Sequence, residues 1–136
     1  MKIVQFEDLD IWKEARELCM LIKEICENSK FSKDYRLKNQ ILSSSGSIMD
    51  NIAEGFERGG NKEFIQFLFI AKGSCGETRS QLYRAKDFGY VSVEKSEELI
   101  KTTSILSKKI SALINYLKRS SLKGAKFKNN NLKPKP

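Results

Sequence analysis

The sequence has no proline before Pro134, so no residue ahead of that position blocks a long helix. Along the same stretch, apolar residues recur mostly at steps of three or four, which is the spacing of one face of an α-helix. The pattern predicts four helices, at about 9–28, 34–58, 61–88 and 93–119. No strand pattern competes with it, and the chain is therefore expected to be all-α.

The links between the predicted helices are short, which places consecutive helices side by side and in opposite directions. The predicted fold is an up-down-up-down antiparallel four-helix bundle, a single domain over residues 1–119. After residue 119 the apolar pattern stops, and residues 120–136 contain five lysines and no acidic residue. We expect residues 120–136 to form a basic disordered tail.

Composition argues against several classes of function. The chain has no histidine, which removes the commonest general base and metal ligand. The three cysteines, Cys19, Cys26 and Cys75, lack the spacing of metal ligands and are interpreted as small buried apolar residues. Neither a glycine-rich phosphate loop nor a nucleophile–base pair is found. We therefore predict a protein that is not an enzyme and uses no metal and no cofactor.

The distribution of apolar and charged residues bears on location. No apolar run reaches the roughly 18 residues of a membrane span, and the N-terminus lacks the apolar core of a signal peptide. A cytoplasmic protein without membrane contact is expected. The net charge is +8, and the lysines of residues 120–136 supply most of that excess.

Small residues interrupt two of the predicted helices. Residues 43–47 read SSSGS, and residues 73–76 read GSCG. Glycine within a helix costs about 1 kcal/mol relative to alanine, so a compensating close contact is expected. We predict that the second and third helices approach one another closely where Gly46 and Gly73 meet.

Polar side chains gather on the same stretches. Six of them are predicted to form a structural polar network: Ser47, Asn51, Glu54, Ser74, Glu77 and Arg79. A buried carboxylate must be paired or hydrogen-bonded, so Glu54 or Glu77 is expected to meet another member or a hydroxyl of the fourth helix. The favoured interpretation is a network that fixes the register of the helices. A ligand or partner site and a catalytic site are the alternatives.

The third predicted helix contains FIQFLFIA, which is apolar on nearly every side. Ile65 and Phe69, four residues apart, lie off the stripe that fills the core. A helix that is apolar on two faces is usually buried on both. We interpret Ile65 and Phe69 as a candidate oligomer interface. The alternative is a broad core stripe with one exposed apolar patch, since scattered apolar residues are normal on surfaces.

Basic residues supply a candidate nucleic-acid-binding set: Arg58, Lys62, Arg84, Lys123, Lys126 and Lys128. The first three are expected to gather at one end of the bundle, and the last three belong to the predicted tail. Phosphate contacts by such residues give binding without sequence specificity. The alternative interpretation is an ordinary solvated face.

Three segments carry a resemblance to a known family: FEDLDIWKEA, residues 39–82, and FGY. The matching positions are Gln40, Ser47, Ile48, Asn51 to Gly55, Phe64, Phe67, Leu68, Ala71, Gly73, Ser74 and Glu77. These segments resemble the bacterial four-helix-bundle proteins encoded in 23S rRNA intervening sequences, over about residues 6–117. Members often have two basic residues after the Gln-Ile pair, where this chain has Leu42 and Ser43.

The resemblance implies a left-handed four-helix bundle that assembles as a homo-oligomeric ring, a pentamer. Related proteins include the accessory variability determinant of diversity-generating retroelements, which binds nucleic acid and a reverse transcriptase through a basic surface. Members encoded in intervening sequences have no assigned reaction and are of unknown function.

Together these features predict a non-enzymatic, homo-oligomeric bundle that binds RNA or DNA through basic surface residues. The alternative is a protein-interaction scaffold that holds a partner enzyme and has no nucleic-acid role.

Overall fold

The computed structural model describes residues 2–131, and the exposure of side chains over residues 2–120. Four α-helices account for most of it: α1 (Asp10–Cys26), α2 (Tyr35–Glu57), α3 (Asn61–Asp87) and α4 (Val93–Asn131). Two 3-10 helices, η1 (Phe6–Asp8) and η2 (Phe31–Lys33), precede α1 and α2. This part of the chain contains no strand, so the prediction of an all-α protein with four helices is confirmed.

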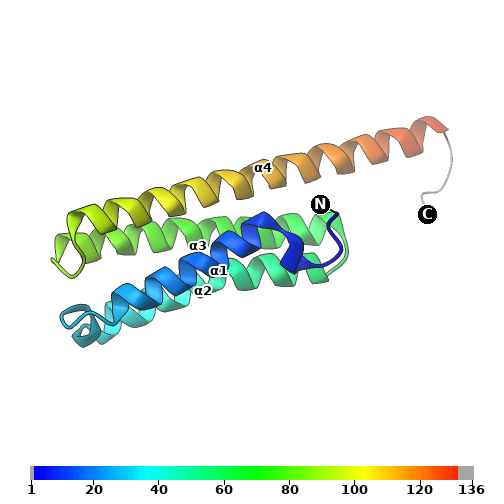
Figure 1. Cartoon of the computed structure of the whole chain (residues 1–136). Helices are drawn as coiled ribbons and strands as arrows, with labels where there is room; N and C mark the ends of the chain where they lie inside the picture. The colour runs from blue at the N-terminus through cyan, green and yellow to red at the C-terminus, as the bar shows by residue number, and fades with distance from the viewer. Residues whose placement is uncertain (1, 132–136) are drawn as a thin grey trace.

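The helices lie lengthwise against one another (Figure 1). Hydrogen bonds join Arg84 of α3 to Gln40 near the start of α2, and Ser74 of α3 to Ser47 further along α2. These bonds place the beginning of α2 beside the last part of α3, and the middle of α2 beside the middle of α3. None of the helices in residues 2–131 combines the length and the apolar character needed to cross a membrane.

The core is built from the apolar positions that the helical spacing predicts. Its almost fully buried apolar side chains include Ala15, Leu18, Ile22, Ile41, Ile48, Ile52, Leu68, Ala71, Leu82, Leu99, Leu106 and Ile110. Burying each leucine or isoleucine contributes about 1.5–3 kcal/mol relative to leaving it exposed. Packing is uneven, because α3 contacts both α2 and α4 extensively whereas α1 contacts α4 much less.

The link between α1 and α2 meets the link between α3 and α4 at one end of the bundle. The side chain of Asp34 accepts from the backbone N–H of Leu37 at 3.1 Å and caps α2. It also accepts from the hydroxyl of Tyr90 at 2.8 Å. These two bonds lower the pKa of Asp34 below its usual value. Gly89, with φ of 74°, ends the α3 side of this arrangement in a conformation that suits glycine.

The fourth helix runs further than its predicted end near residue 119. Helical structure continues to Asn131, and α4 projects past the ends of the other helices (Figure 1). The reason is that no proline precedes Pro134, so no residue of this stretch blocks the helix, and its three lysines are good helix formers. The predicted tail therefore begins as helix, and its residues 132–136 lie outside the described part of the chain.

The predicted contact between Gly46 and Gly73 is wrong. A Cβ atom added at either glycine would meet no atom within 4 Å. Ser44 and Ser45 lie on the buried face of α2. Each residue turns an α-helix by about 100°, so Gly46 is rotated off that face. The close approach of α2 and α3 occurs instead at Gly55, where an added Cβ would lie 2.6 Å from the Cβ of Phe67.

Candidate nucleic-acid interface

A line of hydrogen-bonded polar side chains runs between α2 and α3, and we call it the α2–α3 seam. The Ser44 hydroxyl donates to Oε1 of Gln81 at 2.6 Å and lies 2.9 Å from the Thr78 hydroxyl. Ser47 accepts from the Ser74 hydroxyl at 2.9 Å and from Nδ2 of Asn51 at 2.9 Å. Every buried side-chain nitrogen and oxygen atom in the described part of the chain has a partner. The seam therefore leaves no buried side-chain polar atom without a hydrogen-bond partner.

Three of the six predicted network residues belong to the seam: Ser47, Asn51 and Ser74. Glu77 is exposed and only touches its edge, accepting from Nε2 of Gln81 at 3.4 Å. Glu54 is exposed on α2 and pairs with Arg58 at 2.8 Å.

The expectation of a buried carboxylate is therefore wrong for both Glu54 and Glu77. Both side chains are exposed and meet their partners at the surface, Arg58 for Glu54 and Gln81 for Glu77. Arg79 is half-buried and lines a groove toward α4, away from the seam.

The seam also includes three side chains that the predicted network lacked: Ser44, Thr78 and Gln81. Thr78 and Gln81 follow Ser74 at steps of four and three, the spacing of one helical face. Ser44 fills a polar position in the apolar stripe of α2, between Ile41 and Ile48. That interruption is the signal that could have identified it.

The seam has little catalytic potential of its own, since hydroxyl and amide groups make up its buried part. The nearby thiols are poor nucleophiles at neutral pH. Burial raises the pKa of Cys75 to about 12 and that of Cys26 to about 11. The half-exposed Cys19 donates to the carbonyl of Ser45 at 3.2 Å. Among the described residues, no group of three or more histidine, cysteine or acidic side chains is placed to hold a metal ion.

The predicted gathering of Arg58, Lys62 and Arg84 at one end is wrong. Arg58 and Lys62 flank the link between α2 and α3, whereas Arg84 lies near the other end of α3 and donates to Gln40 at 2.9 Å. Lys62 and Arg84 are roughly 33 Å apart along the helix at 1.5 Å per residue. Because Lys62 and Arg84 lie near opposite ends of α3, the length of that helix keeps them apart.

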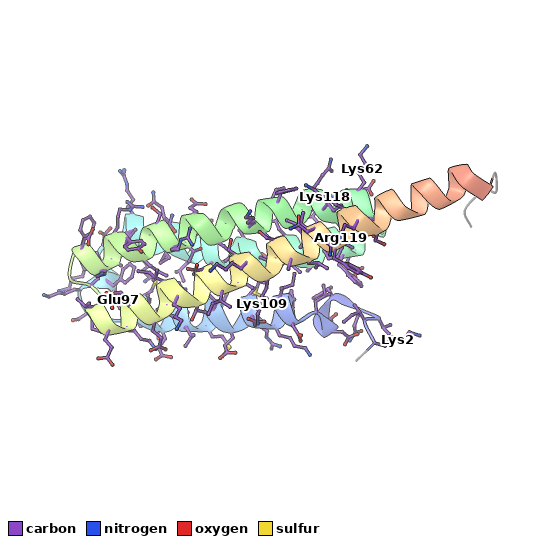
Figure 2. The ribbon with its side chains drawn as sticks, turned by 90° about the horizontal axis from the view of Figure 1, so that it is seen from above. Lys2, Lys62, Glu97, Lys109, Lys118 and Arg119 are labelled. Carbon is purple, nitrogen blue, oxygen red and sulfur yellow. The ribbon has the colours of Figure 1, made fainter. Side chains whose placement is uncertain are left out.

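Other basic residues do join Arg58 and Lys62. Figure 2 shows Lys118 and Arg119 of α4 at the same end of the bundle as Lys62. The Nζ atom of Lys118 lies 4.9 Å from the centre of the Phe69 ring. We call the group Arg58, Lys62, Lys118 and Arg119 the basic end. The sequence prediction missed Lys118 and Arg119, which lie more than 50 residues after Lys62 in the sequence.

Helix α4 extends the basic end beyond the bundle. The chain contains no acidic residue after Glu98. The projecting part of α4 includes Lys123, Lys126 and Lys128, whose side chains lie outside the described residues. A positive charge bias therefore grows along α4 toward the end of the helix.

The two residues of the candidate oligomer interface, Ile65 and Phe69, differ in their exposure. Ile65 is half-buried and packs against the core. Phe69 is 47% exposed, and the neighbouring Ile70 is 51% exposed. Phe69, rather than Ile65, is thus available on the outer face of α3.

The sequence model of the 23S rRNA-intervening sequence protein family matches residues 7–112. A crystal structure of a protein of unknown function from the S23 ribosomal protein family of Bacteroides thetaiotaomicron is similar in fold, with a TM-score of 0.72 and 24% sequence identity. The similarity covers 76% of this chain and 97% of that protein. No curated protein matches this sequence. Because the family model covers most of the chain, the protein belongs to the 23S rRNA-intervening sequence protein family.

Proposed function

We propose that this protein is a non-enzymatic, homo-oligomeric bundle that binds the phosphate backbone of RNA or DNA. The observation that carries the proposal is the projecting helix α4, which has no acidic residue after Glu98 and leaves the bundle at the end where Lys62 lies (Figure 2). Lysine and arginine near phosphates release condensed counterions, and this favours binding without reading the base sequence.

Assembly would strengthen such binding. The proposal includes an up-down-up-down antiparallel, left-handed bundle that forms a ring, a pentamer, with several basic ends in one particle. The exposed Phe69 and Ile70 on the outer face of α3 support contact with a second copy, since apolar residues on an outer face gain by burial. Each added phosphate contact releases further counterions and strengthens binding, so several moderate basic ends bind more firmly than one. The proposed location is the cytoplasm.

The test measures the affinity for a single-stranded RNA at several salt concentrations. The variant combines Lys62→Gln, Lys118→Gln and Arg119→Gln at the basic end. A matched control removes three positive charges at the opposite end of the bundle, with Lys30→Gln, Lys33→Gln and Arg36→Gln, all on exposed residues.

We expect the basic-end variant to bind more than tenfold more weakly, and its slope of log affinity against log salt to fall by roughly 2. The control should bind nearly as the unmodified protein does. Equal losses in both variants, or no binding at about 50 mM salt, would contradict the proposal.

A second candidate function is a scaffold that holds a partner enzyme through the exposed apolar positions Phe69 and Ile70. Co-purification of a single protein that survives nuclease treatment and is lost in Phe69→Ser would favour it. Loss of the partner on nuclease treatment would favour nucleic-acid binding instead.

A further inference from the structure

A second basic feature lies away from the basic end, in an open groove between α3 and α4. Its volume is about 530 Å³, within the range of small-molecule sites. The side chains that matter for its chemistry are Arg79, Tyr83 and Lys86 of α3, and Glu97, Ile100 and Lys101 of α4. Lys62 and Tyr83 are roughly 31 Å apart along α3, so the groove and the basic end are separate features.

The groove has an excess of positive charge. Of its lining residues, Glu97 alone is acidic, and it pairs with Lys86 at 3.3 Å. Arg79 and Lys101 form no ion pair with any residue that the structure describes. Two cations are therefore left to attract an anion. Arg79 is half-buried, and its planar guanidinium suits bidentate binding of phosphate oxygens.

An aromatic and an apolar side chain stand beside these cations. Tyr83 is 49% exposed, and the Nζ atom of Lys86 lies 5.9 Å from the centre of its ring. Ile100 is half-buried and supplies an apolar wall. Aromatic rings next to lysine or arginine are the usual platform for an unpaired base and its phosphate.

A groove on another side of the bundle lacks this chemistry. It lies between α1 and α4, and its volume is about 250 Å³. Three glutamates line it, Glu14, Glu17 and Glu98, and it has no aromatic residue. Such a site repels phosphate, so the combination of cations and a ring distinguishes the α3–α4 groove.

We propose that the α3–α4 groove binds one unpaired nucleotide, with the base against Tyr83 and Ile100 and the phosphate held by Arg79 and Lys101. The nucleotide is either a free nucleoside monophosphate or an unpaired position in a strand. The second source rests on the proposed nucleic-acid function, and the first does not.

The experiment titrates the full chain with adenosine monophosphate, inorganic phosphate and adenosine, followed by amide chemical shifts and calorimetry. We expect the monophosphate to shift amides in residues 79–86 and 97–104 and to bind at least tenfold more tightly than phosphate or adenosine. Tyr83→Leu should weaken monophosphate binding about tenfold and leave phosphate binding unchanged, since stacking on one ring is worth about that factor. Lys101→Gln should weaken both.

Control variants are Tyr116→Leu and Arg36→Gln, exposed residues outside the groove, and both should bind as the unmodified protein does. Tyr83 and Lys101 are themselves exposed, so their variants should keep the thermal midpoint. Binding of the monophosphate no tighter than phosphate, together with unchanged strand binding in Tyr83→Leu, would overturn the proposal.

Two further measurements distinguish a free nucleotide from an unpaired position in a strand. If Tyr83→Leu weakens binding of a single-stranded RNA but not of a blunt RNA duplex, the groove takes an unpaired position in a strand. If only monophosphate binding changes, it takes a free nucleotide. The basic-end variant should bind RNA more than tenfold more weakly and keep monophosphate binding, so failure of the proposed function would leave the groove result intact.

Discussion

The two halves of the contact between α2 and α3 are held in different ways. Near Gly55 the helices meet backbone to side chain, and an added Cβ would lie 2.6 Å from Phe67 and 3.1 Å from Phe64. Near Ser44 the helices are joined by buried hydroxyl groups, while Gly46 and Gly73 face open space. The comparison teaches that glycine content alone does not locate a close helix contact, because only a glycine on the buried face brings the backbones together.

The strongest test of this comparison places alanine at Gly55 and at Gly73. Gly55→Ala should destabilise the protein by about 1–3 kcal/mol, because its methyl group would overpack a site against the Cβ of Phe67, which cannot move without its backbone, and against the ring of Phe64. Gly73→Ala should stabilise it by up to about 1 kcal/mol through better helix propensity. The denaturant midpoint measures both. Equal effects at the two positions would contradict the assignment of the close contact.

The polar half of the contact should respond to loss of a hydroxyl rather than to added volume. Ser44→Ala should cost about 1–3 kcal/mol, because it removes the donor to the buried Oε1 of Gln81, while Thr78 keeps its bond to the carbonyl of Ser74. The neighbouring Ser43 is exposed, so Ser43→Ala should stay within about 0.5 kcal/mol of the unmodified protein. Thermal unfolding of the two variants checks this. Similar midpoints would mean that the buried hydroxyl adds nothing to stability.

Much of the fold follows from periodicity. Ile22, Ile48, Leu82 and Leu106 all fall on the three-to-four spacing of apolar residues, and all are buried. Helix ends were harder to predict, because α4 has no stop signal before Pro134 and continues to Asn131. Spacing fixes which face of a helix is buried, but the length of a helix without a stop signal depends on weak propensities.

The candidate site was less predictable. Ser47 and Glu54 are seven residues apart, nearly two full helical turns, so spacing places them on one face although only Ser47 belongs to the seam. Gly46 is one residue, about 100°, from the buried Ser45, and a stripe of mixed small and polar residues does not define which of the two faces the core. The members of the basic end depend on which helix ends lie together in the fold. The sequence prediction therefore omitted Lys118 and wrongly included Arg84. The residues of a charged surface patch are far apart in sequence and come together only when the helices pack.

A smaller effect tests the bond between Ser47 and Ser74. A double-mutant cycle with Ser47→Ala and Ser74→Ala should give a coupling energy of about 0.5–1.5 kcal/mol. Asn51 should not obscure the result, because its Nδ2 also donates to the carbonyl of Ser47 at 2.7 Å and keeps that partner in Ser47→Ala. Additive effects of the two substitutions would argue that the two hydroxyls do not bond across the contact.

The smallest expected effect concerns the carboxylate that the sequence placed in the polar network. Glu54 and Arg58 form an exposed pair at 2.8 Å, one helical turn apart, with about half of each side chain open to solvent. Such pairs contribute about 0.3–0.5 kcal/mol, so Glu54→Gln should lower the unfolding free energy by no more than that, and less in 1 M salt. A loss above about 2 kcal/mol would require a buried carboxylate. Since Glu54 is exposed in the single chain, that burial would have to come from a second copy, and its dependence on protein concentration would then reveal the assembly.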